Sequence, residues 1–517
     1  MHALRFLLLA VVGLGLDALA QQSTLKPESA TLAPVNPISA TEAASLASRR
    51  PASLVEVLKL AAKNNTDLKA ARAQAAQVAA KAGLVYSALL PELTLSTSYV
   101  HTSVEQKFDT KSLQEGIAQG LAGAIEAVGP AYGLPAQANP AVVGAFRDAI
   151  VAQAGDPVVI VARNSLYGSL LMQQVLFSPQ FFLLPAAQEA VDAARYGSLE
   201  AREQVLLAVA RVYLGLEGLA QIEKAAKDAE AVALRRERDA KAQASAGMTT
   251  EINVLRAQTE TAQARATIAT VSGQRVALLA LLEALAGEPV RPLDDAPTHF
   301  EVTASDEASQ PWEAQWAIKA NQMGVASQER FNFVDRLTWM PSLVGQLKGS
   351  YNSNAGFAGT NWIFDGIVAL QWPLYDRGVR YANLHENDAK TAQLRAQLDG
   401  TRAKARANWV SAKTNVEAAE YALQQAESQA QLAGRAQKQI ESAFQSGMVT
   451  SLEVSDIDSK RFFADSAAAQ SRAQLEIRRV ELAAAEGRLA KMLGLSETEG
   501  DEAVVQGIET MGMGRAR

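Results

Sequence analysis

The chain has 517 residues, no cysteine and a formal net charge of −6 at pH 7. The absence of cysteine excludes disulfides, thiol catalysis, cysteine-ligated metals and an N-terminal lipid-modified cysteine. A mildly acidic chain without clusters of lysine and arginine argues against nucleic acid as a partner.

The first twenty residues have the pattern of an export signal. A short positive region ending at Arg5 precedes an apolar run from Phe6 to Leu16 and a small-x-small site at Ala18–Ala20, so we expect cleavage after Ala20. An uncleaved anchor is disfavoured, because about 18 apolar residues are needed to cross a bilayer. No later segment reaches that length, and any membrane-spanning part is therefore predicted to be a β-barrel.

The first half of the mature chain predicts a helix, two strands and two longer helices. Residues 21–50, rich in Ser, Thr, Ala and Pro, are expected to be a mobile leader. Ser53 and Glu56 form a capping-box pattern at the start of a helix that Pro91 ends. The elements that follow are a strand over 93–100, an insertion over 104–164, a strand over 166–177, a long helix between Pro185 and Gly247, and a helix from Thr250 to about Leu285.

The second half repeats this plan. It predicts a helix over 312–339, strands over 342–351 and 362–375, a long helix over 379–445 and a helix over 451–493. Gly247-Met248-Thr249-Thr250 returns as Gly447-Met448-Val449-Thr450. We therefore expect two structural repeats, 53–287 and 312–495, joined by a linker over 288–311 and followed by a tail over 496–517.

The expected lengths constrain the assembly. Each long helix, at about 66 residues, extends roughly 100 Å, and the two shorter helices of each half match it when stacked end to end. Each chain then supplies four rods and four strands. Rods of this length do not form a compact single-chain globule, so we expect them to need other copies of the chain.

The strands suit an outer-membrane barrel. In the last strand one face carries Trp362, Phe364 and Leu370, while the other carries Asp365 and Gln371; apolar-out and polar-in is the barrel pattern. Aromatic residues at the strand–helix junctions fit an interfacial belt; those assigned to it are Phe177, Trp339, Trp372 and Tyr375. The alternative is a small soluble sheet on the helix ends. Four strands cannot close a barrel with a lumen, so a barrel requires several chains.

These signals together resemble the TolC-like outer-membrane efflux protein family. The resemblance rests on Asn64–Leu68, on Leu89-Leu90-Pro91, on Gln371–Gly378 and on the two Gly-x-x-Thr turns. It implies a mainly α fold with a small β part: a homotrimer whose coiled-coil helices form a periplasmic α-barrel continuous with a shared transmembrane β-barrel, four strands per chain, in outer-membrane lipid.

The resemblance also implies a function. It predicts the passive exit duct of a tripartite efflux or type I secretion system, gated at its periplasmic tip and docked to a periplasmic adaptor and an inner-membrane pump. The alternative is an exported periplasmic coiled-coil structural or adaptor protein without a pore. No catalytic constellation is visible, so we expect no enzyme activity, no cofactor and no dedicated metal site.

The family's pore narrows beside the Gly turns, and the resemblance assigns gate residues there: Glu453, Asp456, Phe444 and Asn253. Six carboxylates from three chains would favour cations and could bind a divalent metal; the alternative is that these acids are solvated and favoured by the helix dipole. The tip turns, expected to dock the adaptor, comprise Gly247, Met248, Thr250, Gly447, Met448 and Thr450.

Two departures from the family pattern stand out. Val449 and Asn253 occupy positions where some members have an Arg and an acid, which puts an Arg–Asp lock at the closed tip in doubt. The 104–164 insertion is expected to form either an external helical cap or a mobile loop.

Overall fold

The computed structural model describes residues 49–128, 140–152, 158–293, 298–302, 304–354, 359–446 and 448–496. The expected signal peptide, nearly all of the expected leader and the tail beyond Ser496 lie outside these residues. The chain divides into a helical unit and a strand unit; the strand unit comprises Tyr86–Phe182 and Val334–Arg380.

The first predicted helix is two helices, α3 (Leu54–Asn64) and α4 (Thr66–Ser87). The capping box of Ser53 and Glu56 is present. Asn65 makes the break: its side-chain oxygen accepts from the Leu68 N–H at 3.0 Å, and its amide donates to the Leu285 carbonyl at 3.0 Å. The prediction of a single helix up to Pro91 was therefore wrong. The Asn65 side chain caps the start of α4 and also binds the end of α8.

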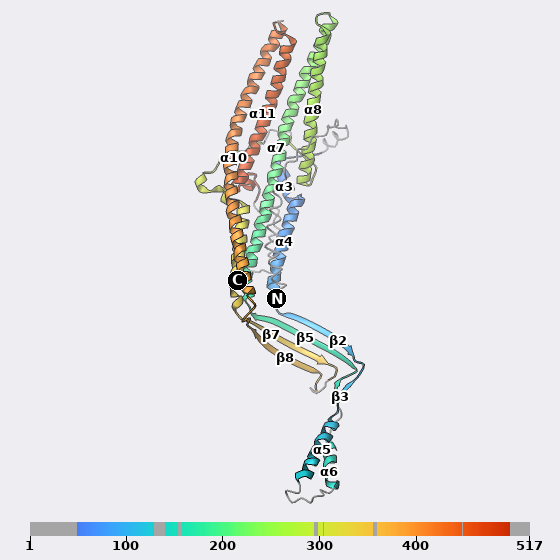
Figure 1. Ribbon diagram of the computed structural model, residues 1–517. Coiled ribbons are helices and arrows are strands. Elements are labelled where there is room, and N and C mark those ends of the chain that lie inside the picture. The colour runs from blue at the N-terminus through green and yellow to red at the C-terminus, as the bar shows by residue number, and fades with distance from the viewer. Residues whose placement is uncertain are drawn as a thin grey trace. The chain divides into compact units, whose positions relative to one another are not determined.

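Four long helices form most of the helical unit (Figure 1), and α7 packs along both α8 and α11. They are α7 (Leu183–Ser245), α8 (Glu251–Ala286), α10 (Val379–Gln445) and α11 (Ser451–Ala485). The bounds of α10 agree with the sequence prediction. One apolar core joins α3, α7, α8 and the end of α11, and a second joins α9, α10 and α11.

Two helices of the second repeat are shorter than expected. α9 (Trp316–Arg336) is separated from a 3-10 turn at Pro311–Ala314 by Gln315, whose backbone is extended with φ of −60° and ψ of 138°. α11 ends at Ala485 and the short α12 (Leu489–Met492) follows, because Gly487 has φ of +64°. In both places a residue with a non-helical backbone interrupts an otherwise helical pattern.

Buried carboxylates hold the segment that joins the two repeats. Glu217 accepts from the Thr298 N–H at 3.1 Å, Glu476 from the Phe300 N–H at 2.9 Å, and Glu486 from the Ser305 N–H at 2.8 Å. A short parallel pair, β1 (Arg50–Ala52) and β6 (Val290–Pro292), joins the segments before and after the first repeat. Arg50, expected in the leader, is thus the first residue of a strand.

The strand unit contains one antiparallel four-stranded sheet in the order β2-β5-β7-β8. The strands are β2 (Glu92–His101), β5 (Asn164–Phe177), β7 (Ser342–Asn352) and β8 (Trp362–Gln371). β8 ends at Gln371 rather than at residue 375, so Trp372 and Leu374 follow the strand instead of alternating within it.

The insertion between the first two strands is helical where it is described. A two-stranded ribbon of β3 (Gln106–Phe108) and β4 (Val158–Val161) leads to a helix pair, α5 (Thr110–Val128) and α6 (Pro140–Ala152). Of the two alternatives for this segment, the described residues favour the helical one.

Two helical segments are long and apolar enough to cross a membrane by length and composition, contrary to the sequence prediction. They are Pro179–Ser245 and Glu251–Ala286, and only 17% of the apolar window in the second is buried within the chain. Such windows also occur in helices that pack in soluble assemblies. The exposed window in α8 indicates a surface available to another helix.

Gly218 allows the close approach of α7 and α11, since a Cβ there would lie 2.6 Å from the Ala473 Cβ. Alanine is the better helix former by about 1 kcal/mol, but overpacking costs about 1–3 kcal/mol. We expect Gly218→Ala to lower the free energy of unfolding in a urea titration, whereas Gly197→Ala on the same helix, where a Cβ would meet nothing within 4 Å, raises it. A gain for both variants would contradict the packing role.

Candidate functional site

The α7–α8 turn reverses the direction of the chain within a few residues. Gly247 has φ of +73°, its N–H donates to the Ala244 carbonyl at 3.0 Å, and the Met248 N–H donates to the Gln243 carbonyl at 2.8 Å. This is the Schellman pattern, which needs a left-handed residue and so favours glycine.

The α10–α11 turn repeats the same geometry. The Met448 N–H donates to the Ala443 carbonyl at 2.9 Å, matching the bond made by Met248 in the first turn. Gly447 itself lies outside the described residues. The two methionine side chains are 79% and 75% exposed, so each turn presents a flexible apolar side chain at its surface.

The two repeats differ in the residue three positions after the helix cap. In the second repeat Thr450 and Glu453 form a full capping box, with the Thr450 N–H donating to the Glu453 carboxylate at 2.7 Å. In the first repeat Thr250 makes no side-chain capping bond, and Asn253 donates instead to the Thr249 hydroxyl at 2.8 Å. The helix start of α11 is therefore better satisfied than that of α8.

The predicted acids have different partners. Hydrogen bonds from the backbone N–H and then the hydroxyl of Thr450 hold the pKa of Glu453 below its ordinary value, so it stays charged at neutral pH. Asp456 lies 2.6 Å from the Lys460 ammonium, with both side chains more than half exposed. Lys460 offsets the charge of Asp456, while no cation is paired with Glu453 among the described ion pairs.

A third acid, which the sequence analysis missed, joins three long helices near the turns. Asp458 on α11 forms an ion pair with Arg236 on α7 and accepts from the Gln437 amide on α10 at 2.6 Å. Gln437 in turn accepts from Arg461. Val454, four residues before Asp458, is 3% exposed; this helical spacing, which places Asp458 on the packed face, was the available signal.

Phe444, the remaining predicted gate residue, is 39% exposed and lies in the last turn of α10. The structure of one chain thus places Phe444, Glu453 and Asp456 around the same turn. Asn253 lies at the other turn. Within the described residues no cluster of His, Cys, Asp or Glu suits a metal ion.

The register of the sheet assigns one face to apolar side chains. Directly paired residues share a face, and the pairs Leu95↔Leu170 and Gly349↔Phe364 are joined by Leu170↔Gly349 into one row across all four strands. Exposed apolar side chains continue this face on neighbouring rows: Leu93, Tyr99, Leu166, Met172, Leu347, Trp362, Val368 and Leu370.

The opposite face is largely polar. Ser96 and Ser169 are hydrogen-bonded through their hydroxyls at 2.7 Å, and Lys348 pairs with Asp365 across β7 and β8. The exposed apolar exceptions on this face are Val100, Tyr167, Ile363 and Ile367. A sheet that exposes one apolar face and directs its polar residues to the other matches a transmembrane barrel wall.

The expected interfacial aromatics lie where the strands end. The Trp372 indole donates to the Trp339 carbonyl at 3.0 Å, and the Arg380 guanidinium lies 4.2 Å from the centre of the Trp339 ring. Tyr375 is 84% exposed and Phe177 is 36% exposed. The positions of these side chains are compatible with an interfacial belt.

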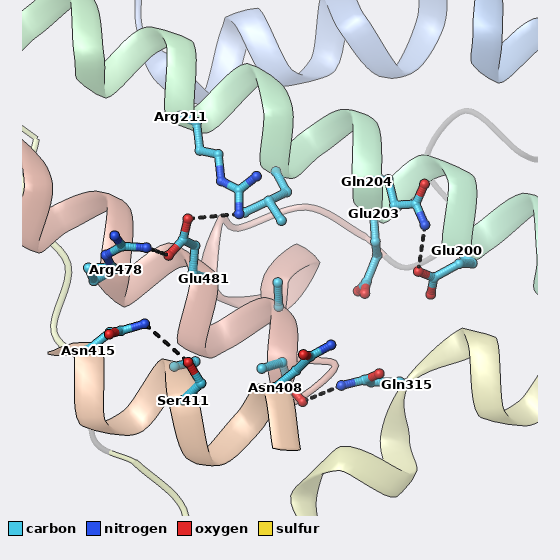
Figure 2. A pocket seen from close by; sticks show the side chains of 14 residues that line it. Glu200, Glu203, Gln204, Arg211, Gln315, Asn408, Ser411, Asn415, Arg478 and Glu481 are labelled. Atoms are coloured by element: carbon cyan, nitrogen blue, oxygen red, sulfur yellow. Dashed lines mark hydrogen bonds and ion pairs between the residues drawn. The ribbon is translucent and has the colours of Figure 1, made fainter. Parts of the chain in front are cut away.

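The helical unit also contains a cavity of about 370 Å³ between α7, α10 and α11. Figure 2 shows Glu203 projecting into it from α7, while Glu481 forms ion pairs with Arg211 at 2.8 Å and Arg478 at 2.6 Å. Burial and then the nearby charge of Glu200 raise the pKa of Glu203 to about 7.

The raised pKa makes folding depend on pH. The folded chain holds the Glu203 proton up to about pH 7 and the unfolded chain only to about pH 4.5, so stability falls as pH rises through this window. We expect Glu203→Gln to raise the free energy of unfolding at pH 8.5 by on the order of 2 kcal/mol and to leave it nearly unchanged at pH 4. Equal effects in urea titrations at the two pH values would contradict the burial of a charge.

The comparisons with known proteins agree with this geometry. The sequence profile of the family described as "Outer membrane efflux protein" matches residues 317–488. No curated protein matches the chain in sequence.

Solved structures share the fold over most of the chain. The outer membrane channel CmeC of Campylobacter jejuni superimposes with a TM-score of 0.67 at 16% identity, covering 89% of this chain and 90% of its own. The outer membrane protein VceC of Vibrio cholerae gives a TM-score of 0.63 at 17% identity, with coverage of 84% and 96%. The open-state MtrE channel of Neisseria gonorrhoeae gives a TM-score of 0.61 at 16% identity, with coverage of 84% and 89%.

The profile covers most of the second repeat, and the shared fold covers both repeats. The profile's family consists of transport conduits and not of enzymes. Residues 317–488 therefore match the profile described as "Outer membrane efflux protein", and the chain as a whole shares the fold of solved outer-membrane channels.

Proposed function

We propose that three copies of this chain form the exit duct of a tripartite export system. The observation that carries the proposal is the single apolar face across β2, β5, β7 and β8. Within the described sheet, β2 and β8 each pair on one side only. Unpaired strand edges are too costly in hydrocarbon, so the edges of neighbouring chains pair and close a barrel of three times four strands.

The helical unit supports the same assembly. Only 17% of the apolar window of α8 is buried within one chain, and an apolar surface that its own chain covers only in part suits an interaction site. Contact with a neighbouring copy would bury it. In this arrangement the helices enclose the tunnel and the strands cross the outer membrane.

The tip would provide the gate and the docking surface. Asp458 and Arg236 tie the second hairpin to α7, so this contact favours one arrangement of the hairpins. The exposed Met248 and Met448 side chains suit a helical partner with an apolar groove, as adaptor proteins would supply. The energy for transport would come from an inner-membrane pump. The pore-free alternative finds no support in the family profile or in the matched structures.

The assembly is tested on the full-length protein in isolated membranes. We expect it in the outer-membrane fraction as a trimer that resists SDS until heated, because edge pairing satisfies every backbone group in the barrel wall. Planar-bilayer recordings on the purified trimer would then show channels. A soluble periplasmic monomer would overturn the proposal.

The pore role of Glu453 is separable from its capping role. Glutamine at this position keeps a capping-box hydrogen bond but removes the charge, so we expect Glu453→Gln to lower cation-over-anion permeability roughly twofold in planar bilayers. Amide exchange at the start of α11 should stay unchanged. Glu453→Ala should lower the selectivity and also speed that exchange.

Asp456→Asn is the matched control, because Lys460 already offsets the Asp456 charge and selectivity should change less. If Glu453→Gln leaves selectivity at the level of the unmodified channel, Glu453 does not face the pore.

A further inference from the structure

The helix pair of the insertion carries a surface that none of the described residues covers. On α5 the side chains of Leu113, Ile117 and Leu121 are 54%, 56% and 44% exposed, whereas Ala118 is fully buried. Leu113, Ile117 and Leu121 are spaced by four residues and so share one side of the helix. We call this side the apolar face of α5.

The apolar face and the buried side of α5 point in different directions. At about 100° per residue, Leu113, Ile117 and Leu121 lie about 140°, 100° and 60° from Ala118, whose burial marks the side of α5 that packs on α6. Glu115 and Gln119, both exposed, occupy the remaining polar side. The apolar face is therefore a separate surface and not the edge of the α5–α6 contact.

Glycine adds a second observation. Gly120 lies beside the apolar face, about 20° from Leu113 around the helix, and a Cβ there would meet no atom within 4 Å. Glycine inside a helix costs about 1 kcal/mol relative to alanine, and this glycine relieves no crowding among the described residues. It leaves room for a neighbouring helix to approach closely.

The helix pair is joined to the edge-forming part of the sheet. The Thr102 N–H donates to the Arg163 carbonyl at 2.8 Å directly beyond the last β2–β5 pair. Asn354, after β7, donates to the Val159 carbonyl in β4 at 3.1 Å. Each strand of the sheet has one end that leads to a long helix, and the ribbon continues the sheet from the other end. Closing the barrel therefore brings three helix pairs together.

The dimensions fit a closed ring. Twelve strands about 4.8 Å apart and tilted by about 40° enclose a barrel of roughly 12 Å radius. Six helices on such a ring lie about 12 Å apart, close to the 10–12 Å diameter of a helix. A ring of six requires each helix to contact its two neighbours at about 120°, and the apolar face of α5 is centred about 100° from its buried side.

We propose that the apolar face of α5 packs against α6 of a neighbouring copy, so that three chains form a six-helix cap on the barrel. The facing surface of α6 consists of exposed small residues four and three positions apart, Ala145, Ala149 and Ala152, which accept larger side chains from α5. The cap rests on the proposed trimer. It would surround the outer mouth of the duct.

The absence of native cysteine allows a direct test in the full-length protein. In the double variant Ile117→Cys with Ala149→Cys, oxidation should link each α5 to the next chain's α6 and yield a covalent trimer on a non-reducing gel. Neither single variant should crosslink. The matched control, Glu115→Cys with Ala149→Cys, places the thiol on the polar side and should give at least tenfold less product.

A further variant tests the close approach. Adding Gly120→Leu to the double-cysteine variant should reduce crosslinking at least fivefold, whereas Gln119→Leu on the polar side should not. Three outcomes would overturn the proposed cap without affecting the proposed duct. They are a native trimer with no crosslink, an intrachain disulfide, and labelling of Ile117→Cys by a lipid-confined reagent. Loss of the trimer in the unmodified protein would instead overturn the duct itself.

Discussion

Among the described residues the four-stranded sheet has two edge strands, β2 and β8, that each pair on one side only, and the rest of the structure depends on how those edges are satisfied. In water an unpaired N–H or carbonyl can bond to solvent, but in hydrocarbon it cannot. The apolar face set by the strand register requires hydrocarbon or its equivalent beside it. In the proposed assembly, neighbouring copies of the chain supply the missing partners of both edges.

The helical unit shows a complementary use of charge. Glu217, Glu476 and Glu486 point inward and bind backbone N–H groups of the connecting segment. A buried carboxylate is costly unless it accepts several hydrogen bonds, and these acids do so. The segment between the repeats thus becomes part of the helical unit although it contains little regular structure.

Much of the fold could be predicted from periodicity and helix-ending residues. The limits of α10, the strand positions and the capping box at Ser53 follow from local rules that act within a few residues. The break at Asn65 could not be predicted this way, because it depends on a hydrogen bond to Leu285, distant in sequence. The β1–β6 pair likewise joins short segments that carry no strand pattern of their own.

The pore role of Glu453 and Asp456 stays a prediction, and the structure adds the partners of these acids. The sequence alone did not show that Lys460 pairs with Asp456 or that Asp458 binds Arg236. Whether an acidic side chain forms an ion pair or is buried depends on which helices lie beside it. Hydrophobic periodicity does not specify those neighbours. The capping difference between Thr450 and Thr250 has a further consequence. In a trimer, the three α11 helices begin with a full capping box, whereas the three α8 helices begin without one. The six hairpins of a trimer are then unequal in local stability, and fraying during opening would follow threefold rather than sixfold symmetry.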